Sequence, residues 1–172
     1  VLKLSGATGT TVWAQSFGSG YVREMTIAPD GSSVYAGGYN SIAATVGTNS
    51  VTGTHGGYVW KLAASDGAPQ WLIDVPPLRG VRAHSDGATL SLMGSPFGGT
   101  VTLGDVTIRG RGTYDFFAAK IRASDGSGIW ALDMACADSF AFVGCSATWP
   151  VMVPRGTQCH VAPNATKVIG FV

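Results

Sequence analysis

Charged side chains are scarce in this sequence. Lys and Arg number 11 and Asp and Glu number 10, so charged residues make up 12% of 172 positions and leave a formal net charge of +1. A typical soluble domain has roughly 25% charged residues. Without a basic excess the chain lacks the electrostatic footprint of a nucleic-acid-binding protein, and no nucleic-acid partner is expected. The hydrophobic share of 45% excludes a disordered chain.

Long apolar runs and helical patterns are absent as well. No run approaches the ~18 residues that a membrane-spanning helix requires, so membrane insertion is not expected. No stretch of ten or more residues combines helical spacing of apolar residues with capping residues. Glycine, by contrast, occurs 25 times, about twice its usual share of ~7%. These features favour an all-β protein.

The sequence does contain a repeat. A lysine is followed by an aliphatic residue, by a glycine at the sixth position and by a tryptophan at the tenth, and this pattern occurs three times. The copies are residues 3–13, 61–71 and 120–130, which are spaced by 58 and 59 residues. Such regular spacing predicts successive copies of one structural unit.

A second block lies between these copies. Residues 27–38 match residues 83–94 at an offset of 56, with Asp30 on Asp86 and Gly31 on Gly87. Asp-Gly pairs tolerate a positive φ, so each is predicted to close a two-residue hairpin turn. Aromatic and β-branched runs beside them, at 34–36, 58–62 and 116–121, have the length and composition of strands.

These segments carry a resemblance to a known family. The sequences FAAKI (117–121), APDGSSVYAGGY (28–39) and GTVTLG (99–104) resemble the short β-propeller repeat family of secreted and surface proteins. The resemblance covers about residues 1–134. It implies blade-like sheets used for binding or scaffolding, with no shared catalytic or cofactor-binding residues.

The repeat suggests a division of the chain. Residues 1–57 and 58–116 are two β repeat units, 117–134 is a partial third unit, and 135–172 is a C-terminal cap or the start of another module. Two units and part of a third are too few to close a ring of ~4 to 8 blades. The expected fold is therefore all-β, with tandem blade-like antiparallel sheets that belong to a β-propeller-like fragment or to an open repeat array, followed by an irregular, disulfide-containing C-terminal segment.

Three cysteines, Cys136, Cys145 and Cys159, fall in this C-terminal segment. They are disulfide candidates, because their spacing lacks the close pair that is usual for structural zinc. Asn164 begins an Asn-Ala-Thr acceptor sequence for N-glycosylation. Together with the low charge, these features favour a secreted or cell-surface glycoprotein.

The tryptophans divide into two groups. Trp13, Trp71 and Trp130 recur in the repeat and are predicted to fill the core between units, although a sugar-stacking platform is the alternative. Trp60 and Trp149 lie outside the repeat and are candidates for a binding surface.

No catalytic pattern stands out. The three histidines form no recognisable triad order, and the Asp-Gly turns lack the alternating ligands of a calcium loop. Neither an enzyme nor a cofactor or metal is expected. The favoured function is a non-enzymatic secreted structural protein that joins other protein chains, notably copies of itself, into a filament or surface scaffold, with glycans as further partners. The alternative is a fragment of a β-propeller that binds carbohydrate or protein.

Overall fold

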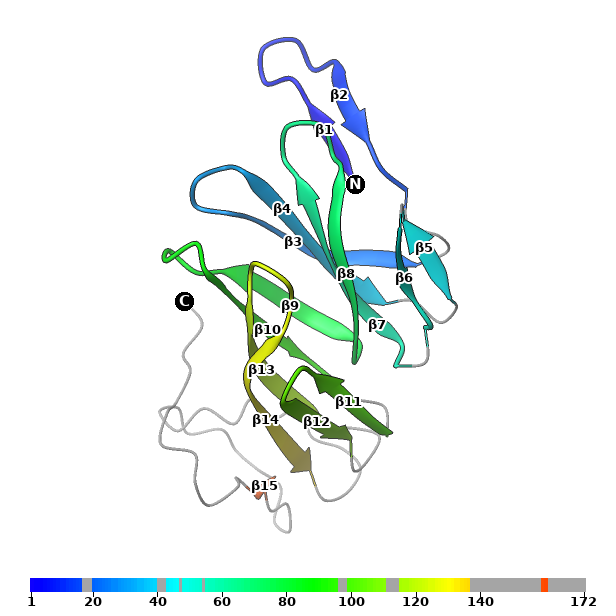
Figure 1. The fold of residues 1–172 in the computed structure, drawn as a ribbon, viewed down its shortest axis with the longest axis vertical. Helices are drawn as coiled ribbons and strands as arrows, with labels where there is room; N and C mark the ends of the chain where they lie inside the picture. Colours follow the sequence, from blue (N-terminus) through cyan, green and yellow to red (C-terminus); the bar gives the residue numbers. More distant parts are fainter. Residues whose placement is uncertain are drawn as a thin grey trace, which may run out of the picture.

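The computed structural model describes residues 1–16, 20–39, 43–46, 48–53, 55–95, 99–110, 115–136 and 159–160. The regular secondary structure of these residues consists of antiparallel strands (Figure 1), which confirms the all-β prediction. Within these ranges no helix is long and apolar enough to cross a membrane.

Two sheets and a hairpin make up most of the described chain. The N-terminal hairpin joins β1 (Leu2–Leu4) and β2 (Thr11–Ala14). The first sheet has the order β3-β4-β7-β8. Its strands are β3 (Tyr21–Ile27), β4 (Ser33–Tyr39), β7 (Gly57–Ala63) and β8 (Pro69–Val75). The small hairpin of β5 (Ala44–Val46) and β6 (Asn49–Val51) leaves the sheet between β4 and β7.

The second sheet repeats this topology. It contains β9 (Leu78–Ala83), β10 (Thr89–Gly94), β13 (Phe116–Arg122) and β14 (Gly128–Cys136) in that order. The short β15 (Cys159–His160) pairs with β14. A small hairpin of β11 (Gly99–Leu103) and β12 (Val106–Gly110) again lies in the connection between the second and third strands of the sheet, β10 and β13. Within the described residues none of these sheets closes on itself.

The sequence period and the sheets are out of phase. The predicted unit boundaries after residues 57 and 116 fall at the start of β7 and β13, in the middle of the two sheets. The Lys-to-Trp copies are the β1–β2, β7–β8 and β13–β14 hairpins. The N-terminal hairpin thus matches the last two strands of a four-stranded sheet.

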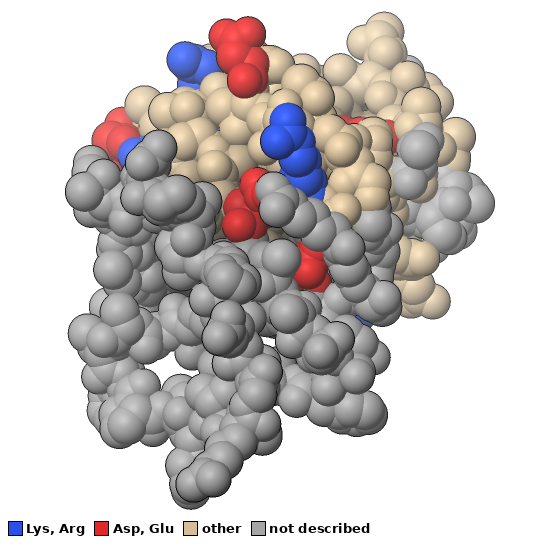
Figure 2. Space-filling model, turned by 90° about the horizontal axis from the view of Figure 1, so that it is seen from below, with Lys and Arg blue, Asp and Glu red and all other residues tan. Residues whose placement is uncertain are grey.

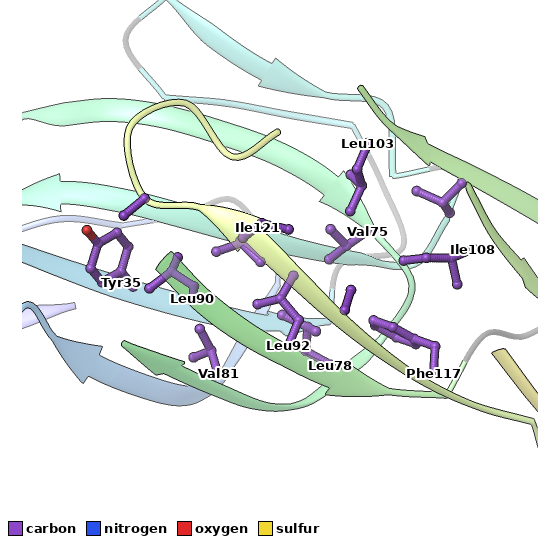
Figure 3. Packing of buried hydrophobic residues seen from close by; sticks show 14 of the residues in the cluster. Tyr35, Val75, Leu78, Val81, Leu90, Leu92, Leu103, Ile108, Phe117 and Ile121 are labelled. Carbon is purple, nitrogen blue, oxygen red and sulfur yellow. The ribbon is translucent and has the colours of Figure 1, made fainter. Parts of the chain in front are cut away.

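The core lies between stacked layers. One apolar cluster joins the first and second sheets (Figure 3), with Tyr35, Val59 and Trp71 on one side and Leu90 and Ile121 on the other. A second cluster joins the N-terminal hairpin to the first sheet through Trp13 and Leu62, among others. β7 is buried on both faces for this reason, so its sequence reads as a nearly continuous apolar run rather than an alternating one.

The hairpin turns are longer than predicted. The two-residue turn expected at Asp66-Gly67 is a four-residue loop, because the Ala63 N–H donates to the Ala68 carbonyl and closes it. The Asp66 carboxylate accepts a hydrogen bond of 2.9 Å from the Ala68 N–H. Gly67 takes the left-handed position with a φ of 76°. The carboxylate bond stabilises a longer loop that the Asp-Gly pair alone does not reveal.

Candidate assembly interface

The lysine and the tryptophan of each repeat lie directly opposite each other. Lys3 pairs with Trp13, Lys61 with Trp71 and Lys120 with Trp130 across their hairpins. In all three hairpins the register shifts immediately after the lysine, where a β-bulge leaves one extra residue before the tryptophan. Cross-strand partners share a face of the sheet, so the bulge explains why a spacing of ten residues brings both side chains to the same side.

Both side chains bind the next layer. The Lys3 ammonium donates a hydrogen bond of 2.6 Å to the Ala64 carbonyl, and the Trp13 indole N–H donates one of 3.1 Å to the same oxygen. One carbonyl thereby accepts a charged and a neutral donor from the preceding hairpin. We call this arrangement of lysine, tryptophan and turn carbonyl the clamp.

The clamp is repeated one layer further along. Lys61 donates to the Ala123 carbonyl at 2.9 Å, and the Trp71 indole N–H donates to it at 3.1 Å. Ala64 and Ala123 both lie three positions after the lysine of their own hairpin. The Tyr35 ring adds to the second clamp, since its centroid is 5.7 Å from the Lys61 ammonium and 6.0 Å from the Trp71 ring.

The turn glycine completes the contact. A Cβ atom at Gly67 would lie 2.7 Å from Cε3 of Trp13, and one at Gly126 would lie 3.0 Å from a methyl group of Ile73. Both glycines have positive φ angles. The glycine is therefore required twice, once for the backbone conformation and once for the close approach of the preceding layer.

The third clamp lacks its acceptor. Lys120 and Trp130 are half-buried, and neither side chain makes a hydrogen bond within the described part of the chain. β13 alternates between buried and half-buried residues, whereas the equivalent β7 is buried on both faces. The face of the second sheet that carries Lys120 and Trp130 thus has the same residues as the internal interfaces, but its side chains are less buried.

The opposite end of the stack shows the complementary half. In the N-terminal hairpin Gly6 occupies the position of Ala64, and Gly9 occupies that of Gly67. Gly9 has the same left-handed conformation as Gly67, yet nothing lies within 4 Å of a Cβ atom placed there. The hairpin also exposes about half of the Leu2 and Leu4 side chains. Its outer face presents a turn and an apolar surface without a covering layer among the described residues.

The predicted tryptophan sites have different environments. Trp13 and Trp71 are buried and Trp130 is half-buried. The prediction that Trp60 forms a binding surface is wrong, because its side chain is fully buried between the N-terminal hairpin and the first sheet. β7 is an inner strand with both faces covered, so a residue outside the repeat register is still a core residue there. Trp149 lies outside the described residues.

The other predicted sites fall largely outside the description. Cys145 and Asn164 belong to residues that the structure does not describe. The backbone places Cys136 and Cys159 opposite each other in the β14–β15 pair.

Asp30, Asp86 and Asp125, which lie in three of the turns, are held in their charged form. The Ser32 N–H and hydroxyl hydrogen-bond to Asp30 and lower the pKa of its carboxyl group. The Ala88 N–H and the Thr89 hydroxyl do the same for the pKa of Asp86, and Ser127 does so for the pKa of Asp125. Hydrogen bonds to a carboxylate favour its ionised form. The turns are therefore electrostatic as well as conformational elements.

A groove of about 380 Å³ lies where the two sheets meet. Its lining includes His55 and Asp74 from the first-sheet side and the turn at Asp125 from the second. The Asp74 carboxylate accepts a 2.7 Å hydrogen bond from Thr52 and lies 3.6 Å from Nδ1 of His55. The described residues contain no group of three or more potential metal ligands. The groove offers hydrogen-bonding groups for a polar ligand.

The sequence reasoning missed the acceptor half of the clamp. The acceptors are backbone carbonyls, which carry no residue signature of their own. The available signal is the small residue three positions after each lysine, which is Gly6, Ala64 or Ala123. A small side chain at the same place in every copy indicates close approach of another group.

Comparisons of the chain with family models, with curated proteins and with solved structures gave no significant match.

Proposed function

We propose that this chain is a non-enzymatic, secreted structural protein whose β-propeller-like repeats join copies of the chain into a larger assembly. The observation that carries the proposal is the clamp. It joins successive layers inside the molecule. Among the described residues, Lys120 and Trp130 have no such acceptor, and a matching turn at Gly6 and Gly9 is uncovered.

The two open halves belong to different surfaces of the molecule. A contact of Lys120 and Trp130 of one copy with the Gly6 carbonyl of the next is head-to-tail, and such heterologous contacts produce closed rings or open filaments. The few charges support this mode of association, because on the described part of the face in Figure 2 the charged side chains are scattered rather than gathered into one patch. Low charge reduces the repulsion between copies.

Secretion is supported by the C-terminal sequence. Three cysteines and one N-glycosylation acceptor within the last 37 residues suit an oxidising compartment in which glycans are added. The glycine-rich, charge-poor composition also suits a surface scaffold.

The association is tested with a matched pair of glycine variants. In Gly9→Asn the asparagine tolerates the left-handed conformation, but its side chain enters the space that the Trp130 ring of a second copy needs. Overpacking costs ~1–3 kcal/mol, so the association constant should fall by about tenfold to a hundredfold. Light scattering after size exclusion, over a range of concentrations, measures the change.

Gly31→Asn is the control. Gly31 also has a positive φ and open space around it, and its repeat equivalent Gly87 has open space even though its sheet packs against the first sheet. This variant should associate like the unchanged protein. A stable monodisperse monomer at every concentration of the unchanged protein would contradict the proposed assembly.

The second candidate is a fragment of a ligand-binding β-propeller. The groove lined by His55, Asp74 and Asp125 favours it, because polar groups from two sheets converge there. A glycan-array screen, repeated with Asp74→Asn, tests this function. Binding that the variant abolishes would favour a ligand-binding protein over a scaffold.

A further inference from the structure

The groove between the two sheets has walls that the core holds in place. Ile73 comes from β8, and Val101 and Leu103 come from β11. Val101 and Leu103 are buried in the apolar cluster that joins the sheets, and Ile73 packs against that cluster. The groove volume of about 380 Å³ lies near the lower end of the ~300–1,000 Å³ that ligand sites usually span. Its size suits a small ligand or a single side chain.

The Asp74 carboxylate in the groove is only partly hydrogen-bonded. Its Oδ2 accepts hydrogen bonds from the hydroxyl and the N–H of Thr52, at 2.7 and 3.3 Å. Its Oδ1 is buried and has no donor within the described ranges. Nδ1 of His55 is 3.6 Å from Oδ2, which is too far for a hydrogen bond. A buried acceptor without a donor costs free energy, which a donor from a ligand would recover.

A ligand can approach this carboxylate. Asp74 keeps 19% of its side-chain surface exposed, and the residue belongs to the lining of the groove. The same holds for His55, whose side chain is 30% exposed. The acidic group is therefore placed on the wall of the groove rather than sealed in the core.

The charge of Asp74 has no basic partner in the groove. No lysine or arginine is among the described residues that line it. The second carboxylate of the lining, Asp125, is better compensated, because the N–H and hydroxyl of Ser127 and the charge of Arg122 lower its pKa. Arg122 also donates a hydrogen bond of 2.9 Å to the Ser127 hydroxyl. Asp74 is thus the lining residue that is best placed to attract a cation.

The repeat shows that the stacking of layers does not require this carboxylate. Asp74 lies three positions after the tryptophan of its hairpin, and Asp133 occupies this position in the third copy. In the first copy the residue is Ser16, which is exposed. The first hairpin nevertheless forms its clamp with Ala64. The acidic residue is therefore available for another role.

The walls beside the carboxylate are aliphatic. The described lining contains Ile73, Val101 and Leu103 but no aromatic side chain. A flat ring therefore has no aromatic surface on which to stack. An aliphatic stem, by contrast, loses water-exposed apolar area against such walls.

We propose that the groove binds a primary ammonium group carried on an aliphatic stem. The ammonium lies beside the Asp74 carboxylate, and the stem lies along Ile73 and Leu103. An ammonium fits better than a guanidinium, because the planar fork of a guanidinium pairs with both oxygens of a carboxylate and Thr52 already occupies one of them. The inference rests on the second candidate function, to which it gives a ligand class, and it does not depend on the clamp.

The same chemistry occurs in a free aliphatic amine and in the lysine side chain of another protein. Two probes distinguish these sources. The first is n-butylammonium chloride, and the second is Nα-acetyl-lysine N-methylamide, in which peptide groups flank the side chain. Binding of the first alone assigns the groove to free amines. Binding of the second with equal or higher affinity assigns it to lysine side chains.

The experiment titrates the full-length, isotopically labelled protein with each probe and follows the backbone amides by NMR. The amides of the lining, at Thr102, Gly104, Gly126 and Ser127, should shift with either or both of the probes. n-Butanol has the same stem without the charge and should bind at least about tenfold more weakly than n-butylammonium, since hydrogen bonds between charged groups are stronger than neutral ones. Butyrate, which carries the opposite charge, should leave these amides unchanged.

Variants then test the carboxylate. Asp74→Asn keeps the shape and an acceptor for Thr52 but removes the charge, so its affinity for n-butylammonium should fall at least about tenfold. Asp105→Asn is the matched control, because Asp105 is an exposed residue of the β11–β12 turn outside the lining. It should bind like the unchanged protein.

A second variant keeps the test valid if Asp74→Asn does not fold. Thr102 is exposed and lines the groove, so Thr102→Lys brings an ammonium of its own towards Asp74. This variant should also bind n-butylammonium at least about tenfold more weakly. The dispersion of the amide signals establishes that each variant is folded.

Three results would overturn the inference: equal affinity for n-butanol and n-butylammonium, amide shifts confined to residues outside the lining, or full binding by folded Asp74→Asn. A neutral glycan that binds through Asp74, with no response to either amine, would refute the ligand class while the ligand-binding function stands. No binding of glycans or amines would contradict both. Light scattering of Asp74→Asn should match that of the unchanged protein, so the assembly is judged separately.

Discussion

At the scale of single residues, the defining feature is a backbone carbonyl that accepts two donors from another layer. The Ala123 oxygen receives the Lys61 ammonium and the Trp71 indole N–H. A hydrogen bond from a charged donor contributes more than one from a neutral donor, about 1.5–3 against about 0.5–1.5 kcal/mol. The tryptophan also contributes its ring to the core. The two residues therefore stabilise the same interface by different means.

This sharing predicts a coupling between the two donors. Trp71→Phe removes one donor and part of the ring, and Lys61→Met removes the other donor but keeps most of the apolar stem. Each variant should lower the free energy of unfolding by about 1–3 kcal/mol. The double variant leaves the Ala123 carbonyl without either donor, so its loss should differ from the sum by about 0.5 kcal/mol or more.

Denaturant unfolding of the single and double variants measures the coupling. Gln70→Ala is the control, because Gln70 neighbours Trp71 in β8 but is exposed. Strict additivity of Trp71→Phe and Lys61→Met would show that the two donors act independently.

At the scale of elements, the hairpin turn is both a chain reversal and a packing surface. The turns at Gly9 and Gly67 have the same backbone bonds, from the glycine N–H to the carbonyl four residues earlier, at 2.8 and 2.9 Å. Only the turn at Gly67 lies under a tryptophan of the preceding layer. The same local structure thus has different tertiary surroundings.

This difference predicts unequal effects of one substitution. Gly9→Ala and Gly67→Ala both place a Cβ atom at a positive φ, which costs about 1–2 kcal/mol. At Gly67 the Cβ atom also meets the Trp13 ring at 2.7 Å, and overpacking adds about 1–3 kcal/mol. Thermal unfolding of dilute protein should show the larger loss for Gly67→Ala. Equal losses would mean that the Trp13 ring moves aside freely.

At the scale of the whole molecule, three repeated carboxylates link stability to pH. Hydrogen bonds from turn residues hold the pKa values of Asp30, Asp86 and Asp125 below their ordinary value of 3.8. A carboxylate with a lowered folded-state pKa stabilises the fold above its unfolded pKa, and this contribution disappears as the pH falls through the folded pKa. Stability should therefore decline below about pH 4.

Replacement of the three aspartates by asparagine should flatten this decline, because the amide accepts the same hydrogen bonds but does not titrate. Unfolding free energies measured between pH 2 and pH 7 test this expectation. The variant should be less stable than the unchanged protein at neutral pH and should approach it in acid. An unchanged slope would assign the acid sensitivity to other groups.

The sequence by itself determined the strand-rich class and the repeated hairpins, because strand composition, turn glycines and a constant lysine-to-tryptophan spacing are local properties. It also indicated which tryptophans belong to the repeat. Local patterns fixed neither the phase of the sheets nor the burial of Trp60, and the turns proved longer than the Asp-Gly pairs suggested. The stacking of the layers alone decided these features, and it also decided which carbonyls accept the hydrogen bonds of the clamp. The reason is that each hydrogen bond of the clamp joins a side chain to a backbone carbonyl that is between 51 and 62 positions away in the sequence. Such contacts exist only once the sheets have packed.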